Sequence, residues 1–394
     1  MTIDAGMKAP NPPKIAKLPH ISPSIYAAAR LCRARAAWTG LKTRPRLPQH
    51  PSGILGLCFH AVVEKAATGE LAAASDGALN AARDWFDGKC RELYESAHPL
   101  LRLKFRTPDR LPGYYLFRER AAVAALNAFT SPRARNAIQH PPSGTDSHNS
   151  IVERRFESSD GKLVGRPDVI NALKGEVTDY KTGLCAGDDL ISDAELRQLR
   201  LYVNLASENG ISVNVGVIAR ANGRRLSVCI TPLEASGEAK EAKDSLDELN
   251  EAIGAGADFR QLAEPSASGC RLCPCVPFCE KFWETAESGW LDDCGAQLEG
   301  SIAAIARSTL QGLHLVSLMV DVRRGTIPTG LYAVEQVPSD WLLVGESKLP
   351  EVGETIRILD ARRLSADPTT LRVDRTATTL WSTAGTPPAG GSVG

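Results

Sequence analysis

The sequence lacks the features that would point directly to a partner. Lysine plus arginine and aspartate plus glutamate are equal at 46 each, so the chain has no overall basic field, and a site for a polyanion has to be a local patch. No run approaches the roughly 18 apolar residues that a membrane span requires, and residues 1–17 lack the apolar core of a signal peptide. We therefore expect a cytoplasmic protein with no membrane partner.

A GxxxxGK[ST] phosphate loop is also missing, so these residues do not encode an ATP-driven motor. What is present is ample material for a core, because 43 % apolar and 23 % charged residues make a globular composition. The length of 394 residues suggests two domains. The cytoplasm keeps thiols reduced, so we interpret clusters among the ten cysteines as metal ligands before disulfides.

The chain divides into two folded parts between two tails. Residues 1–17 and 382–394 have no hydrophobic period and are predicted to be disordered. Residues 18–295 are predicted to form an α/β core with a mixed central sheet flanked by helices. Residues 300–381 are predicted to form a small β-barrel of the OB type.

Periodicity and turn residues place the individual elements. The expected helices are 54–67, 71–98, 118–129, 189–207 and 235–253. The expected strands of the core are 151–157, 162–171, 175–181, 211–219 and 224–230. The last two flank Asn222-Gly223, a strong tight-turn pair, and residues 131–150 are predicted to be an internal loop. The expected strands of the barrel are 314–322, 330–337, 341–345, 355–360 and 370–380.

Two carboxylates are expected to face each other on one hairpin of the core. A four-residue loop would pair Asn171 with Glu176, and counting back along the ladder sets Asp168 opposite Asp179. Strand alternation puts Lys181 on the same face as Asp179. Opposed carboxylates repel, and Mg²⁺ or Mn²⁺ would compensate them, with an ammonium beside the metal. The alternative is a surface hairpin whose charges face solvent.

This segment resembles a known nuclease signature. GRPD at 165–168, ten further residues and DYKTG at 179–183 resemble the PD-(D/E)xK motif in the form that RecB-type nucleases carry. The resemblance implies a restriction-endonuclease-like core. It also implies that Asp168, Asp179 and Lys181 are catalytic, and that the two aspartates bind the metal.

Three further segments resemble motifs of the same family, in the same order. HISPS at 20–24, followed by Cys32 and Arg33, resembles its N-terminal S-x-S…C-x-R motif. GLCFH at 56–60 resembles its helical G-x-x-x-H, which implies that His60 is an additional metal ligand. QLRLY at 198–202 resembles its Q-x-x-x-Y, whose two side chains share one helix face.

The resemblance implies that Gln198, Tyr202, Arg33 and Arg35 position DNA. The two arginines belong to an acid-free basic segment, residues 30–46, which is equally consistent with a solvated face. Taken singly, His60 would be a half-buried helix histidine and Tyr202 a core aromatic. For Glu153, on the strand before the hairpin, an exposed strand charge is preferred over an additional acidic residue of the site.

Four of the cysteines lie within ten residues, at positions 270, 273, 275 and 279, and four cysteines at one site suit zinc or an iron-sulfur cluster by chemistry alone. The C-x2-C-x5-C spacing with one remote cysteine resembles the iron-sulfur branch of the superfamily, which includes AddB-like and CRISPR adaptation nucleases. That branch implies a 4Fe-4S cluster on Cys32, Cys270, Cys273 and Cys279. Cys275 is a departure and an alternative ligand.

The hypothesis from the sequence is a metal-dependent DNA nuclease that cuts single-stranded DNA or DNA ends. It would serve repair, recombination or phage defence, with a helicase or recombination partner. The alternatives are an inactive nuclease-fold module that binds nucleic acid or a helicase, and a four-cysteine zinc protein without catalysis. The barrel would bind single strands or dock a protein, and its aromatic residues are chiefly Tyr332, Trp341 and Trp381.

Overall fold

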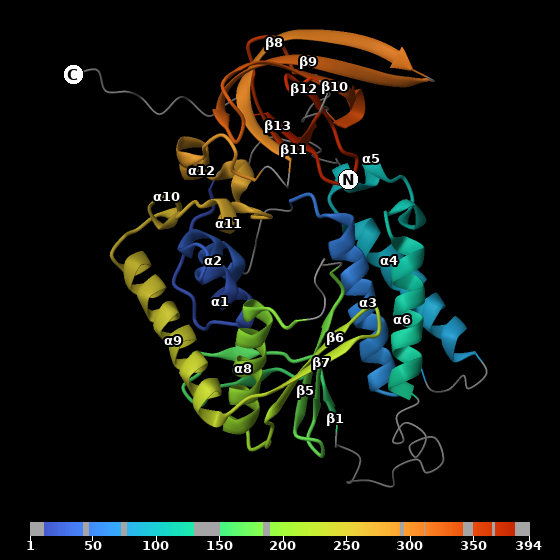
Figure 1. Cartoon of the computed structure of the whole chain (residues 1–394), viewed down its shortest axis with the longest axis vertical. Coiled ribbons are helices and arrows are strands. Elements are labelled where there is room, and N and C mark those ends of the chain that lie inside the picture. Colours follow the sequence, from blue (N-terminus) through green and yellow to red (C-terminus); the bar gives the residue numbers. More distant parts are fainter. Residues whose placement is uncertain are drawn as a thin grey trace.

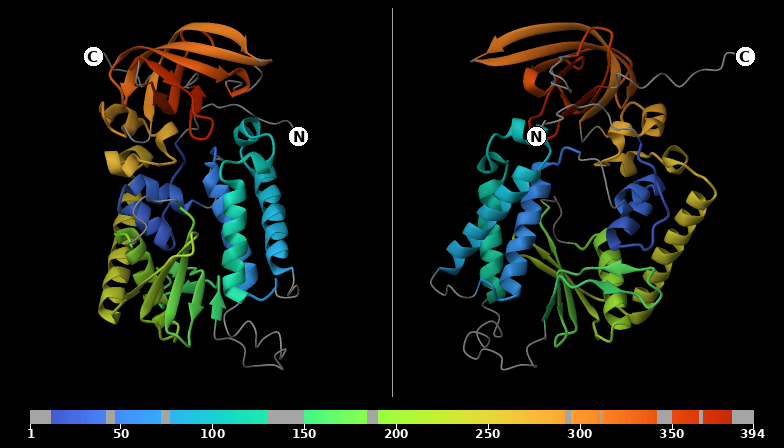
Figure 2. Two further views of the ribbon diagram at one scale, coloured as in Figure 1. Left: turned by 45° about the vertical axis from the view of Figure 1, so that its right-hand side comes forward. Right: turned by 180° about the vertical axis from the view of Figure 1, so that it is seen from behind.

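The chain folds into four parts, which Figures 1 and 2 show from three directions. The computed structural model describes residues 12–41, 47–71, 77–129, 150–183, 190–291, 295–310, 312–341, 350–364 and 367–382. The four parts are a mixed sheet with its covering helices, a helical lobe, a segment that carries the four clustered cysteines, and a C-terminal barrel. The expected loop at 131–150 and most of the expected tails lie outside the described residues.

The central sheet is mixed, as predicted. Its five strands are β1 (Ser150–Val152), β4 (Val169–Asn171), β5 (Glu176–Lys181), β6 (Val215–Arg220) and β7 (Arg225–Cys229), paired in the order β1-β4-β5-β6-β7. Only β5 and β6 pair in parallel among these strands. A parallel pair needs a crossover, which α8 (Asp193–Glu208) supplies. A separate short pair, β2 (Phe156–Glu157) and β3 (Val164–Gly165), lies beside the sheet.

The predicted hairpin register is confirmed. Asn171 pairs with Glu176 and Val169 with Thr178 across β4 and β5. The loop ends at Gly175, whose φ of +61° favours glycine, and the expected tight turn between β6 and β7 has Gly223 at φ +90°. The sheet therefore places the residues before β4 next to the carboxyl end of β5.

Helices cover the sheet, and each begins with a clear capping signal. Both α8 and α9 (Pro232–Gly254) begin with a capping box, formed by Ser192 with Glu195 and by Thr231 with Glu234. The N-terminal helices α1 (Pro23–Ala29) and α2 (Arg33–Gly40) pack in the same core. No helix among the described residues is long and apolar enough to cross a membrane.

The helical lobe has a hydrophobic core of its own. It consists of α3 (Pro51–Ala67), α4 (Ala78–Ser96), α5 (Pro99–Lys104), a 3₁₀ turn (Pro108–Arg110) and α6 (Tyr114–Phe129). Three helices were expected here, 54–67, 71–98 and 118–129, and α5 was not among them. The second expected helix corresponds to α4. It ends at Ser96 because Pro99 keeps the preceding residues extended and starts the new helix α5.

The cysteine segment, residues 258–285, is built from short elements. They are α10 (Phe259–Leu262), α11 (Ala267–Cys270), a 3₁₀ turn (Val276–Phe278) and α12 (Glu280–Thr285). Phe278 and Trp283 of this segment are buried in the same core as the sheet and the barrel. The segment therefore joins these two parts.

The C-terminal part is a closed barrel, as predicted. Its strands are β8 (Ala296–Leu310), β9 (Leu313–Gly325), β10 (Gly330–Pro338), β11 (Thr355–Arg363), β12 (Thr370–Arg372) and β13 (Thr379–Ser382). Pairings run from β8 to β9, β10, β12, β11 and back to β8, with β10 and β12 parallel. This order of five strands is that of an OB barrel, and β13 adds to the edge of β11.

Two features of the barrel differ from the expected strands. The longest strand, β8, was not predicted, since its alanines and serines carry little β signal. It bends at Gly300, where a Cβ would lie 2.4 Å from the carbonyl oxygen of Asp321. The expected strand 370–380 is two strands, and for 341–345 the structure describes only Trp341, which ends a 3₁₀ turn.

A buried arginine anchors the barrel to the cysteine segment. Arg357 on β11 donates from Nε to Glu299 (2.6 Å) and from Nη1 to the carbonyl of Pro277 (2.7 Å). Its guanidinium also pairs with Glu280 and lies 5.1 Å from the ring centroid of Trp283. The charge can be buried because each of the three guanidinium nitrogens has a hydrogen-bond or ion-pair partner.

The anchor yields a stability prediction. Arg357→Met should lower the free energy of unfolding by about 3–5 kcal/mol, because it removes the buried one of the two arginines that pair with Glu299 and leaves Arg324 alone beside that carboxylate. Urea unfolding followed by tryptophan fluorescence measures the effect. The exposed Arg372→Met should change it by less than about 0.5 kcal/mol. Equal effects of the two substitutions would contradict the role of Arg357 as an anchor.

Candidate metal centre

Two aspartates meet where β4 begins and β5 ends. Asp168 directly precedes β4, and its Oδ2 accepts a hydrogen bond from the backbone N–H of Tyr180 (2.6 Å). Asp179 lies on β5 with its side chain only 5 % exposed. The register of the hairpin thus brings both carboxylates to one end of the sheet.

A glutamine on α8 connects the second aspartate to the lysine. Gln198 donates from Nε2 to Asp179 Oδ1 (2.7 Å) and to the hydroxyl of Tyr202 (3.0 Å), and its Oε1 accepts from Lys181 Nζ (2.8 Å). Lys181 Nζ also lies 2.8 Å from Asp179 Oδ2. The Q-x-x-x-Y spacing therefore serves one network that fixes the carboxylate and the ammonium.

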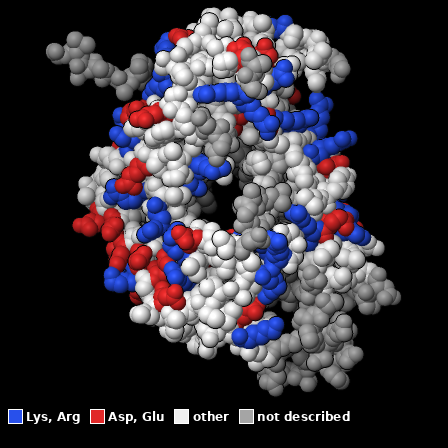
Figure 3. All heavy atoms as spheres, in the orientation of Figure 1, with Lys and Arg blue, Asp and Glu red and all other residues white. Residues whose placement is uncertain are grey.

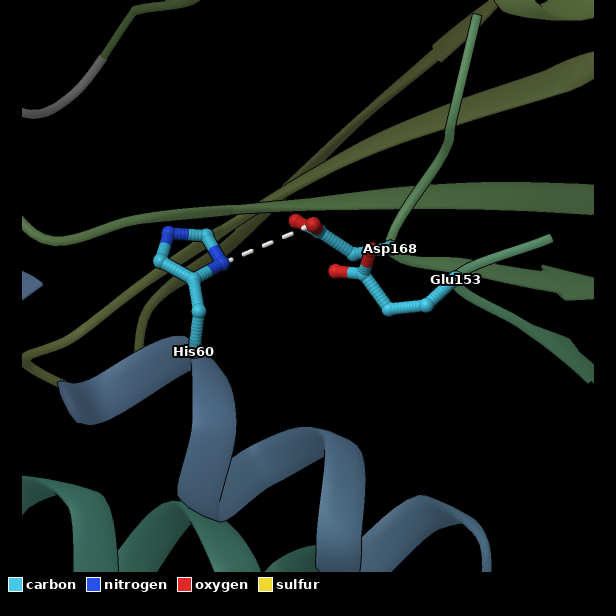
Figure 4. Close-up of side chains that lie close together, drawn as sticks. All are labelled: His60, Glu153 and Asp168. Atoms are coloured by element: carbon cyan, nitrogen blue, oxygen red, sulfur yellow. Dashed lines mark ion pairs between the residues drawn. The ribbon is translucent and has the colours of Figure 1, made fainter. Parts of the chain in front are cut away.

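The histidine of α3 reaches the same site from the helical lobe. His60 Nδ1 lies 3.5 Å from Asp168 Oδ1 (Figure 4). Close approach of α3 needs Gly56, since a Cβ there would lie 2.9 Å from Thr182 Oγ1. The G-x-x-x-H and DYKTG segments are thus packed against each other, and the glycine brings His60 within reach of the sheet.

Glu153 belongs to this site, which the sequence reading did not favour. Ligand atoms of His60, Glu153 and Asp168 lie within 4.8 Å of one another, and no other such group of three occurs among the described residues. Figure 4 shows the carboxyl group of Glu153 directed at Asp168. The signal was available in the pairing of β1 with β4, because Val152 opposite Val169 puts the next residue beside Asp168.

The backbone and an arginine hold Glu153 in place. Its φ is +50°, a left-handed conformation uncommon outside glycine, and its N–H donates to the carbonyl of Asp168 (3.0 Å). Arg166 Nε lies 2.7 Å from Glu153 Oε2 and also donates to its carbonyl oxygen. Strained, over-determined backbone of this kind is concentrated at functional sites.

The protonation of the acids follows from burial and neighbours. Burial raises the pKa of Glu153 to about 7, and the adjacent Asp168 adds to the rise. Burial also raises the pKa of Asp179, against the opposing effect of Lys181. For Asp168 the effect of burial is overcome by hydrogen bonds from His60 and the Tyr180 amide, so its pKa is lowered. Excess negative charge therefore gathers here without enough cations from the protein.

The donor set fits a hard divalent cation. Asp179 Oδ2 is buried and accepts no hydrogen bond of good geometry, although the ammonium of Lys181 is near it. Such an orphaned buried oxygen calls for a partner. Carboxylate oxygens with one imidazole nitrogen are ligands that Mg²⁺ and Mn²⁺ accept. His60, Glu153 and Asp168 form the group that would hold the ion, and Asp179 is a neighbouring carboxylate outside that group, beside Gln198 and Lys181.

The cysteines form a second cluster on the far side of the sheet's core. Burial raises the pKa of Cys279 to about 12, and the neighbouring thiols of Cys273, Cys32 and Cys270 add to the rise. Cys275 is 2 % exposed and shares a hydrogen bond with Cys273, whose pKa falls to about 7 in consequence. The structure thus brings the remote Cys32 to the four clustered cysteines. Cys185 and Cys294 lie outside the described residues.

The two arginines expected to position DNA contact the cysteine segment. Arg33 Nη2 lies 2.7 Å from Glu264 Oε1, and Arg35 Nη1 donates to the carbonyl of Gly269 (3.1 Å), next to Cys270. The rest of the basic segment, residues 42–46, lies outside the described residues. These contacts give both arginines a role in holding the cysteine segment against α2.

A mixed sheet with a DxK strand, a preceding aspartate and a histidine from an adjacent helix defines a nuclease core of the PD-(D/E)xK class. The chain matches the family model of the PD-(D/E)XK nuclease superfamily over residues 20–280, and it belongs to that superfamily. No curated protein matches it.

Among solved structures, one that matches is titled "Crystal structure of SSO0001". The identity is 18 %, with 46 % of this chain and 94 % of that chain covered, and the TM-score is 0.23. At that score the likeness carries no weight for fold or function.

The geometry of the metal centre predicts how strongly each acidic residue contributes to metal affinity. Mn²⁺ binding, measured by electron paramagnetic resonance, should be lost in Asp168→Asn, because this carboxylate lies 3.5 Å from His60 Nδ1 and near Glu153 in the ligand group. Glu153→Gln should weaken it by about tenfold to a hundredfold. Glu157→Gln, an exposed acid on the neighbouring β2, is the control and should bind like the unchanged protein. Unaltered Mn²⁺ affinity in Glu153→Gln would remove this residue from the site.

Proposed function

We propose that the protein is a metal-dependent deoxyribonuclease that hydrolyses phosphodiester bonds in single-stranded DNA or at DNA ends. The observation that carries this is the convergence of Asp168, Asp179 and Lys181 with His60 and Glu153 at one end of the sheet. A nuclease fold that only binds nucleic acid does not require a complete set of metal ligands. Nor does it require a lysine paired with a buried aspartate, as Lys181 is with Asp179. The intact set supports catalysis over the inactive module.

The reaction requires few residues beyond those that bind the ion. A bound Mg²⁺ or Mn²⁺ supplies Lewis acidity toward the phosphate and toward the attacking water. Lys181 donates from Nζ to Gln198 Oε1 and forms an ion pair with Asp179, and its partly exposed ammonium would orient that water. Gln198 keeps Asp179 and Lys181 in a fixed geometry, and Tyr202 holds Gln198 in turn. Gln198 and Tyr202 therefore act on the substrate through these groups.

The cysteine cluster is proposed to hold a 4Fe-4S cluster on Cys32, Cys270, Cys273 and Cys279. What supports this proposal is the approach of Cys32 to the clustered cysteines, since the thiols of Cys273, Cys32 and Cys270 all act on the buried Cys279 and raise its pKa. Cys275 shares a hydrogen bond with the thiol of Cys273, and in this proposal it orients that thiol and is not itself a ligand.

The cellular setting is proposed on the same grounds. A site of reduced thiols fits the cytoplasm. The barrel adds a surface of the OB type, a fold that accommodates single strands or a protein partner such as a helicase. A nuclease that cuts single strands or DNA ends could serve repair, recombination or phage defence. The fold does not distinguish these pathways, so the substrate cut in the cell has to identify the pathway.

Cleavage of end-labelled single- and double-stranded DNA tests the function. With Mg²⁺ or Mn²⁺ the protein should cut, and a chelator should stop it. Asp179→Asn and Lys181→Met should each reduce the rate by about 10²–10³-fold or more, because each removes a charge that acts at the reacting phosphate. Lys162→Met removes an exposed lysine paired with Asp247 and should cut normally. Wild-type cutting by Asp179→Asn would refute the assignment.

Colour tests the proposed cluster. Protein purified without oxygen should be brown, since thiolate-to-iron charge transfer absorbs visible light, whereas zinc with its filled d shell is colourless. Cys32→Ser should bleach the absorption and lower the melting temperature, because a link between α2 and the cysteine segment is lost. Cys275→Ser should retain the iron. A colourless protein with stoichiometric zinc would contradict the cluster.

A further inference from the structure

The parts of the chain close into a frame, as the views of Figures 1 and 2 agree. The sheet meets the helical lobe where the rings of Phe59 and Tyr180 lie 6.3 Å apart. On its other side the sheet meets α8 through Gln198, and α8 packs with α9 and α1 in one core with the cysteine segment. The barrel then spans from the cysteine segment to the lobe.

The barrel has a firm joint at each end of this span. At the cysteine segment the joint is Arg357 with Glu299, Glu280 and Trp283. At the lobe the joint is the short helix α5, whose Leu100 belongs to the core of the barrel and sheet while Leu101 belongs to the core of the lobe. Adjacent residues of one helix thus tie two separate cores together.

A buried lysine fixes the second joint. Lys104 is 4 % exposed, donates from Nζ to the carbonyl of Thr378 (2.5 Å) and lies 4.8 Å from the ring centroid of Trp341. Arg375 of the barrel donates back to the carbonyl of Lys104 (2.5 Å). Burial lowers the pKa of Lys104 to about 8, while Asp374 and Asp360 favour its charged form. The joint is therefore specific and closed in this structure.

The metal centre lies on the inner edge of the frame. Its ligand group comes from both walls, with His60 on α3 of the lobe and Glu153 and Asp168 at the sheet. The side chains of His60 and Lys181 are 32 % and 29 % exposed, so a substrate can reach them. Figure 3 shows the middle of the molecule hollowed between the walls and the barrel.

One outer wall of the frame offers a poor path for a polyanion. Helix α9, on the outside of one wall, carries seven acidic residues and two lysines. Figure 3 shows these acidic side chains gathered along that outer edge. Phosphates are repelled there, so a strand is not expected to reach the metal centre across α9.

We infer that the substrate is a single strand with a free end, which passes through the frame to reach the metal centre, so that the same sequence closed into a circle is not bound or cut. The inference rests on the proposed nuclease function. Its basis is topological, since the sheet, the lobe, the barrel and the cysteine segment surround the approach to the site. A strand without an end can enter only if a joint opens.

A topological trap tests the inference without cleavage. The full-length Asp179→Asn protein is mixed with linear single-stranded DNA that carries biotin at both ends, and streptavidin is then added. Complexes formed before streptavidin should survive a jump to molar salt, because the blocked strand cannot slide out. Phosphate contacts alone dissociate steeply with salt. Complexes attempted after streptavidin, or with a circle of the same sequence, should not survive.

The outcomes separate this inference from the proposed function. Salt-resistant complexes only with DNA loaded through a free end support threading, even if the unchanged protein proves not to cut. Equal loss of all complexes in salt, or stable binding of the circle, overturns threading. Cutting of circle and linear strand at equal rates by the unchanged protein would overturn threading while leaving the nuclease intact.

Opening the joint at the lobe should admit the circle. Lys104→Glu places a carboxylate near Asp374 and Asp360, so the contact with Thr378 should separate. The variant should cut circles while its rate on linear strands stays within a few-fold of the unchanged protein. Lys240→Glu, on the outer face of α9, is the matched control and should still reject circles.

If Lys104→Glu does not fold, as judged by circular dichroism, Arg375→Ala takes its place, because it removes the hydrogen bond to Lys104 and the cation–π contact with Phe105 across the same joint without burying a new charge. A folded variant at this joint that separates the barrel from the lobe yet still rejects circles would overturn the inference.

Discussion

The structure around the metal centre depends on the opposition of two carboxylates, Asp168 and Asp179, at the end of one hairpin. Two negative groups in a poorly hydrated place repel strongly, and the protein supplies only part of the compensation. Lys181 lies beside Asp179, and the Tyr180 N–H donates to Asp168. The remaining charge of the acids at this end of the sheet is what a bound cation would compensate.

Several local features of the sequence follow from that constraint. Gly165, immediately before the RPD triplet, leaves room for Tyr202 and Leu205 of α8, since a Cβ would lie 2.6 Å from Leu205 Cδ1. That close approach lets Gln198 reach Asp179. Gly56 does the same for the other wall by admitting Thr182. The glycines of two motifs are therefore packing residues that bring α8 and α3 against one strand end.

The site was predictable wherever a regular element set the position. The loop length between β4 and β5 determined which residues pair, and the helical spacing of Gln198 and Tyr202 put both on one face. The prediction for Glu153 was wrong because this residue follows the end of β1 and has a positive φ. Strand alternation does not predict the direction of a side chain at such a position. The contacts of Arg33 and Arg35 could not be predicted from neighbouring residues, because their partners Glu264 and Gly269 lie more than two hundred residues away in the sequence.

The fold of the core and the barrel was predictable for the same reason, and the joints between the parts were not. Short turns and alternating strands are local, so the mixed sheet and the barrel followed from nearby residues. Arg357 with Glu299 and Lys104 with Thr378 are pairs of distant residues in which a charge is buried against the usual rule. Nothing in the neighbourhood of Lys104 distinguishes it from a solvated lysine at the end of a helix.

The two hydrophobic cores explain why the metal centre lies where it does. One core holds the sheet, the cysteine segment and the barrel, and the other holds the lobe. His60 reaches the site from the lobe, whereas Asp168 reaches it from the sheet, so a cation bound by both would join the two cores at the bottom of the frame. Lys104 joins them at the top. Ligand binding stabilises the state that contains the assembled site, so the ion would favour the closed frame as well as supply the chemistry.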